Sequence, residues 1–258
     1  MTRNIHQVSY RASMLPKLFF MLVAILGVSC QSGSDAKSDL NQEVKGEDSS
    51  VYTATDTIAG ECYYTDTTII AGEIYQFVLD KDSGVVYVMR QADTVFKLED
   101  GYGVLEHEEA TGFFDFNEDG YDDVYINYVT NVPGVQNVAL FDPGSKTFNL
   151  VLGLRDWFPA SVHLTGDYYY SYSRAGCADW NWESYLFKIK NYSTVPLGLI
   201  EGDGCDSNKI EVYRVLDGDE DKRKLVETFP IDTIDTYESY KWGFIEDYWR
   251  GHYKSYTR

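Results

Sequence analysis

The segment FDFNEDGYDD, residues 114–123, combines five acidic residues, an Asn and a Gly within ten positions. Groups that could hold a hard cation through oxygen occupy positions 1, 3, 5, 7 and 9 of the pattern DxNxDGxxD: Asp115, Asn117, Asp119, the backbone carbonyl of Tyr121, and Asp123. Calcium takes about six to eight oxygen ligands, and alternate side chains of a tightly curled loop can converge on one ion. Gly120 permits the sharp turn. The spacing therefore predicts a structural calcium site.

The loop differs from an EF-hand at its twelfth position. A chelating Glu is required there, but the sequence has Ile126, inside the strand-like segment DVYINYV. The loop thus joins two expected strands, GFFDF and DVYINYV, and Asp123 completes the ligand set while Asp122 is expected to face water. The alternative is an acidic turn without an ion, in which the carboxylates would repel one another.

The sequence contains no established catalytic motif. The sequence has no GxSxG, and the pair His107 and Glu108 lacks a second His at Thr111, so it does not form a zinc-binding helix. Two further acidic clusters, at residues 217–221 and 201–206, have no ligand pattern and are expected to be solvated turns. Because a glycosidase carboxylate pair would be hidden among 41 acids, an unrecognised hydrolase stays an alternative.

The elements that must position the loop are predicted to be strands. Short segments rich in Tyr, Val, Ile and Phe alternate with Gly, Asp, Asn and Ser turns, which favours an all-β antiparallel meander. Hairpin-like segments begin at Tyr87, Ala139, Tyr185 and Val212. Their first two intervals suit the blades of an irregular or small β-propeller, and a two-sheet β-sandwich is the alternative.

The last segment is the exception. Apolar residues recur there at intervals of three and four, which predicts one face of a short C-terminal helix: Trp242, Ile245, Trp249, Tyr253 and Tyr256. We expect this face to pack against the domain rather than to form an aromatic binding stripe.

The N-terminus indicates export. Residues 1–29 hold three basic residues, no acid and the apolar run LFFMLVAILGV, which is too short to span a bilayer as a helix and is typical of a signal peptide. The following Cys30 ends the stretch GVSC, which resembles a bacterial lipobox apart from Gly27, where Leu is preferred. Cys30 is thus the predicted lipidation site, with an ordinary cleavable signal as the alternative. Residues 30–50 are expected to be a disordered tether and residues 51–258 a single domain.

The net charge indicates which classes of partner the exported chain could bind, and the cysteine positions indicate which disulfide it could form. Without residues 1–29 the chain has 41 acidic against 19 basic residues, a net charge of −22. Such a surface repels nucleic acid and attracts cations or basic proteins. An exported chain can form disulfides, and Cys177 and Cys205 lie level at the open end of an expected hairpin turning near Tyr192. We predict that they are bonded and that Cys62 is free.

The single DxNxDGxxD loop resembles the calcium loops of FG-GAP (integrin-like) repeats. The ordered motifs DFNEDGYDDVYI, LFDPGSKTF and SYSRAGCADWNWESYLFKIKN are also similar to those of a family of exported bacterial proteins. That family includes calcium-binding periplasmic lipoproteins that act as immunity proteins against secreted peptidoglycan hydrolases, and it is similar in fold to lysozyme inhibitors. The resemblance covers residues 105–203 and implies the same metal loop.

These observations give three functional hypotheses. The first is a calcium-stabilised lipoprotein of the cell envelope, facing the periplasm or the cell surface, that binds and inhibits a basic peptidoglycan hydrolase. The second is a glycan-binding cell-surface module, suggested by the 22 Tyr and 5 Trp. The third is the hydrolase already mentioned.

Overall fold

Antiparallel strands dominate the chain that the computed structural model describes, which comprises residues 63–100, 103–104 and 111–257. The predicted signal segment, Cys30, the tether, Cys62 and His107 lie outside these ranges. The described residues belong to one compact unit, Ala54–Arg258. No helix within them is long and apolar enough to cross a membrane.

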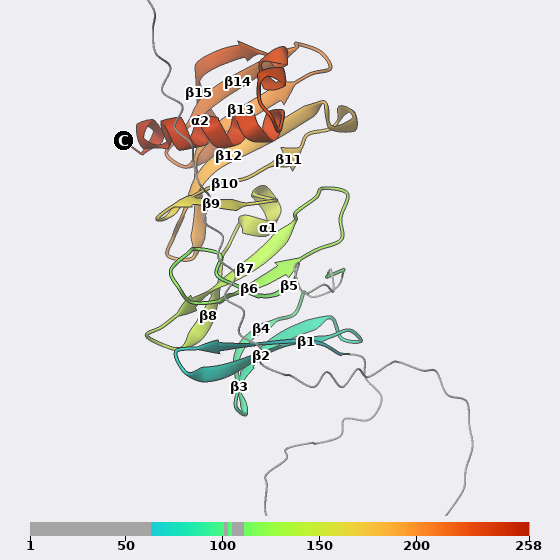
Figure 1. Cartoon of the computed structure of the whole chain (residues 1–258), viewed down its shortest axis with the longest axis vertical. Helices are drawn as coiled ribbons and strands as arrows, with labels where there is room; N and C mark the ends of the chain where they lie inside the picture. The colour runs from blue at the N-terminus through green and yellow to red at the C-terminus, as the bar shows by residue number, and fades with distance from the viewer. Residues whose placement is uncertain (1–62, 101–102, 105–110, 258) are drawn as a thin grey trace, which may run out of the picture. The chain divides into compact units, whose positions relative to one another are not determined.

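The first two sheets are four-stranded meanders in which each strand pairs with its successor (Figure 1). The first sheet contains β1 (Tyr63–Ile70), β2 (Glu73–Asp80), β3 (Val85–Arg90) and β4 (Asp93–Leu98). The second sheet contains β5 (Thr111–Phe114), β6 (Asp123–Asn127), β7 (Gln136–Asp142) and β8 (Thr147–Leu150). This strand order is the one expected for propeller blades.

The third sheet is larger and has the order β15-β14-β13-β12-β10-β9, with β11 also paired to β12. Its strands are β9 (Val162–Thr165), β10 (Tyr168–Tyr170), β11 (Ser173–Arg174), β12 (Asn181–Lys190), β13 (Ser193–Asp203), β14 (Lys209–Leu216) and β15 (Asp219–Pro230). The helical segments are α1 (Leu154–Trp157), η1 (Cys177–Asp179), η2 (Ile231–Thr236) and α2 (Lys241–Tyr256).

Three hydrophobic cores hold these layers together. The first core lies between the first and second sheets and includes Tyr75 of β2 and Ile126 of β6. The second joins β7 and α1 to β10 and β12, for example through Val138 and Phe187. The third lies between the third sheet and α2, with Trp249 at its centre. Each element therefore buries side chains against the next layer.

Strand β7 contributes to two of these cores. Every residue of β7 except Asp142 is buried. Ala139 and Phe141 point into the first core, whereas Val138 and Leu140 point into the second. The continuous apolar run of this strand follows from its position, because a strand covered on both faces needs no polar alternation.

Helix α2 packs on the third sheet as predicted, although its buried face is displaced. The buried residues are Phe244, Ile245, Tyr248, Trp249 and Tyr256. The inclusion of Trp242 in the packed face was wrong, because this side chain is 46% exposed and touches the core only at its edge, where its ring lies against buried Tyr172. Phe244 and Tyr248 are buried because both rings meet Phe229 of β15 edge-on.

The all-β class, the antiparallel meander and the C-terminal helix are confirmed. The four predicted hairpins correspond to β3–β4, β7–β8, β12–β13 and β14–β15. The described residues form three open sheets, so the two-sheet sandwich is wrong. The first two sheets have four strands in sequence order, as a propeller blade does, whereas the third sheet has seven strands. The propeller arrangement itself stays a prediction.

Candidate metal centre

The acidic loop connects β5 to β6 at one end of the second sheet (Figure 1). Phe114 of β5 and Asp123 of β6 are the last paired residues before the loop leaves the sheet. Within the loop, Glu118 and Gly120 have φ of 55° and 91°, in the left-handed region. Gly adopts this region freely, and it lets the chain curl back on itself.

The side chains at alternate positions turn inward onto the loop backbone. Asp115 accepts the N–H of Asp119 through Oδ1 (3.1 Å) and that of Gly120 through Oδ2 (3.0 Å). Asn117 Oδ1 accepts the same Asp119 N–H at 3.1 Å. Asp119 Oδ1 accepts the N–H of Tyr121 at 2.9 Å. The structure thus brings oxygens of Asp115 and Asn117 to the same backbone N–H group, and the metal-ligand set stays a prediction.

Asp123 differs from the other candidates because it is fully buried. Its Oδ2 accepts the N–H of Phe116 in the loop (3.1 Å), and its Oδ1 accepts the N–H of Phe141 on β7 (2.8 Å). Burial raises the pKa of Asp123 to about 7, against the lowering effect of these two hydrogen bonds, and the nearby carboxylates of Asp119 and Asp115 raise it further. A cation would remove this electrostatic cost.

The donor set fits calcium in its chemistry, since every side-chain ligand would be an oxygen atom. An ionised carboxylate has about four lone-pair sites, so Asp123 can ligate an ion while keeping both N–H bonds. Across the described ranges, however, no three His, Cys, Asp or Glu side chains are placed so that they could together hold a metal ion. Calcium would therefore require the side chains of Asp115, Asn117 and Asp119 to move closer together.

Two contacts of the loop with distant strands were missed by sequence reasoning. The expectation that Asp122 faces water was wrong, because its Oδ2 accepts a hydrogen bond from Thr68 Oγ1 on β1. Glu118 lies 3.2 Å from Nδ1 of His163 on β9, and Nε2 of that ring contacts the Gly166 carbonyl at 2.9 Å. Nothing local to the motif signals these partners, which lie more than 40 residues away.

The predicted disulfide is confirmed. Cys177 and Cys205 are bonded, with their Cα atoms 6.6 Å apart, at the open end of the β12–β13 hairpin. Asp203 closes the turn that carries Cys205 by accepting the N–H groups of Cys205 (3.2 Å), Asp206 (3.0 Å) and Ser207 (2.9 Å). These bonds lower the pKa of Asp203 to about 2.

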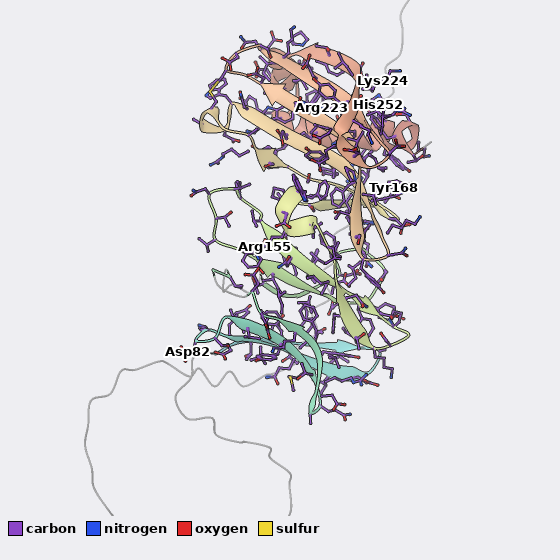
Figure 2. The ribbon with its side chains drawn as sticks, turned by 180° about the vertical axis from the view of Figure 1, so that it is seen from behind. Asp82, Arg155, Tyr168, Arg223, Lys224 and His252 are labelled. Carbon is purple, nitrogen blue, oxygen red and sulfur yellow. A yellow bond between two sulfur atoms is a disulfide. The ribbon has the colours of Figure 1, made fainter. Side chains whose placement is uncertain are left out.

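The other acidic residues of the third sheet serve ordinary structural contacts. Arg223, labelled on β15 in Figure 2, pairs with Glu201 on β13 and stacks over the Tyr213 ring at 4.7 Å. Asp219 pairs with Lys222 at 2.8 Å at the start of β15. Of the two clusters, only Asp206 and Asp217 lie in turns, because Glu201 and Asp203 belong to β13 and Asp219 and Asp221 to β15. The expectation of solvated turns was therefore wrong for the strand residues.

Comparisons with known proteins give little beyond this geometry. No family model and no curated protein matches the sequence. Among solved structures, the chain is similar to one described as "Structure of a Xanthomonas Type IV Secretion System related protein", with a TM-score of 0.44 and 19% sequence identity. The match covers 63% of this chain and 93% of that one. A similarity of this size carries no functional argument.

Proposed function

We propose that this protein is an exported lipoprotein of the bacterial cell envelope, anchored through Cys30, that serves as a calcium-stabilised scaffold for binding another protein. Its partner is a basic secreted peptidoglycan hydrolase, which it inhibits. The observation that carries the metal part of the proposal is the gathering of Asp115, Asn117 and Asp119 around one turn of backbone, with buried Asp123 beside them. The family resemblance supports the inhibitory part.

Calcium is proposed as a structural ion rather than a catalytic one. The loop joins two strands of the second sheet, and Asp123 links it to β7 through the Phe141 N–H. An ion bound there would hold the loop, β6 and β7 together. Because an ion that binds only the folded state stabilises it by mass action, calcium should raise the melting temperature by an amount set by its concentration relative to its affinity.

A calcium titration with two variants tests the site. The shift in melting temperature between calcium and chelator should be lost in Asp119→Asn, which removes one proposed ligand charge. It should persist in Glu118→Gln, which removes the same charge from the neighbouring position outside the ligand set. Equal melting of the wild type in calcium and in chelator would refute the metal site.

The inhibitory part requires a separate assay. The net charge of −22 after signal removal favours a basic partner through long-range attraction. The mature protein, mixed with a basic lysozyme and suspended peptidoglycan, should slow the clearing of the suspension in proportion to its concentration. Unchanged clearing at a molar excess of the protein, together with no complex in gel filtration, would contradict an inhibitor of this enzyme class.

A further inference from the structure

A second candidate site lies on the third sheet, away from the acidic loop. An open pocket of about 470 Å³ is lined by η1, η2 and the first turn of α2. Its walls come from three separate parts of the chain: residues 178–182, 231–235 and 239–242. The first of these parts lies within the motif SYSRAGCADWNWESYLFKIKN, but the sequence analysis assigned it no binding role.

Exposed aromatic rings line this pocket. Trp180 is 66% exposed, Tyr240 62% and Trp242 46%. Trp242 is held in place by Tyr172, with ring centroids 3.8 Å apart. Large aromatic side chains bury much apolar area when they find a partner, and they are enriched where proteins bind ligands or one another. Three of them gathered on one pocket therefore indicate a binding surface.

The charge of the pocket is negative and partly uncompensated. The one cation among its lining residues, Lys241, is already neutralised, because its Nζ lies 2.7 Å from Asp179 Oδ2 and 3.0 Å from the Asp179 carbonyl oxygen. Asp232 and Asp235 of η2 also line the pocket. Neither forms an ion pair within the described part of the chain. Two carboxylates are thus available to a positively charged ligand.

The residues that line the pocket are held in place by covalent and polar contacts without a ligand. The Cys177–Cys205 disulfide anchors η1, and Lys241 ties η1 to α2 across the pocket. Tyr240 has φ 49° and ψ −131°, a conformation that is strained for a bulky residue and that tends to occur at functional sites. A preorganised pocket loses little conformational freedom on binding, so even a small ligand group can be held.

We propose that this pocket binds an arginine side chain presented by a basic protein. A guanidinium is planar and always charged, so it can stack on an indole face while its N–H groups bond carboxylates. Trp180 and Trp242 supply the faces, and Asp232 and Asp235 supply the carboxylates. A neutral sugar could also stack on the rings, but it would leave both carboxylates without a counter-charge. The inference deepens the proposed function by giving its basic partner a specific contact.

The test uses short peptides, so it is independent of any hydrolase and of calcium. The indole N–H signals of the mature protein are followed by NMR during titration with N-acetyl-Gly-Arg-Gly-amide and with the same peptide containing citrulline, a neutral isostere of arginine. Chitotetraose serves as the sugar. We expect the arginine peptide to shift the Trp180 and Trp242 signals and to bind about tenfold or more tightly than the citrulline peptide.

Variants test whether the arginine peptide binds in this pocket. Trp180→Leu and the double change Asp232→Asn with Asp235→Asn should each weaken arginine-peptide binding by about tenfold. The matched control for the Trp variant is Trp157→Leu, an exposed Trp outside the pocket. The matched control for the Asp variant is the double change Asp217→Asn, in the β14–β15 turn, with Asp221→Asn, near the start of β15. Both control proteins should bind as the wild type does. Equal binding of arginine and citrulline, wild-type binding by the pocket variants, or tighter binding of chitotetraose would overturn the proposal. The peptide titration and the inhibition assay are independent. Loss of peptide binding would refute the arginine pocket, whereas absence of inhibition would refute the proposed hydrolase partner.

Discussion

At the scale of single residues, Asp123 combines two roles that the other acids of the loop do not share. Its carboxylate satisfies the backbone N–H groups of Phe116 and Phe141 inside the core, whether or not an ion is present. Asp119 is exposed and bonds only within its own loop. Removal of the two side chains should therefore have different consequences for the protein without calcium.

We predict that Asp123→Ala lowers the free energy of unfolding by about 2–6 kcal/mol in chelator, because each of the two buried N–H groups left without an acceptor costs about 1–3 kcal/mol. Asp119→Ala should cost much less under the same conditions. Urea unfolding in chelator measures both. If the two variants unfold at the same urea concentration as the wild type, the buried carboxylate has no structural role.

Asp203 gives a prediction for acid stability. Its pKa lies at about 2 against an ordinary 3.8, so its contribution to stability is present above about pH 4 and is lost as the pH falls towards 2. Asp203→Asn should flatten the loss of stability over this window. Asp206→Asn removes a neighbouring carboxylate without removing the acceptor of the turn, and should leave the acid profile unchanged. Urea unfolding between pH 2 and pH 5 would show the difference, and identical profiles for both variants would contradict it.

At the scale of elements, the contact between α2 and the third sheet depends on Gly198 of β13. A Cβ atom at this position would lie 2.9 Å from the rings of both Trp249 and Tyr256. The bare backbone of one glycine therefore lets the helix approach the sheet closely. The apolar periodicity of residues 242–256 predicts the helix, but only the packed structure shows which strand residue accommodates it.

We predict that Gly198→Ala lowers the free energy of unfolding by about 1–3 kcal/mol, since overpacking forces the two rings to shift. Gly251→Ala, on α2 itself, has nothing within 4 Å of the new Cβ. It should stabilise the protein by about 0.5–1 kcal/mol through helix propensity. Opposite signs in thermal or urea unfolding are the expected result. A neutral Gly198→Ala would mean that α2 can move away from the sheet without loss.

The same elements show how far sequence reasoning reaches. Local signals predicted the strands, the four hairpins, the curled acidic loop and the Cys177–Cys205 bond, because each depends on nearby residues or on one hairpin register. Contacts such as Asp122 with Thr68, and the pocket around Trp180 and Trp242, join segments that are more than 50 residues apart. No local periodicity encodes them. The contact of Trp242 with Tyr172, 70 residues earlier in the chain, was missed for the same reason.

At the scale of the whole molecule, the excess of acidic residues should make stability depend on salt. A net charge of −22 after signal removal destabilises the compact state by self-repulsion, and salt at about 0.1 M screens charges beyond about 10 Å. We predict that sodium chloride raises the melting temperature in chelator, equally in the wild type and in Asp119→Asn. This separates general screening from the ion-specific effect of calcium, which should require Asp119. A salt effect confined to the wild type would contradict this distinction.

The burial of β7 on both faces makes unfolding of the three sheets cooperative. Its alternate side chains belong to two different cores, so β7 cannot leave one core while remaining in the other. Opening of the second sheet would therefore expose apolar surface towards the first sheet and the third sheet at once. The three sheets, although each is a separate hydrogen-bonded network, are thus coupled into one cooperative unit, in which β7 is the most deeply buried link.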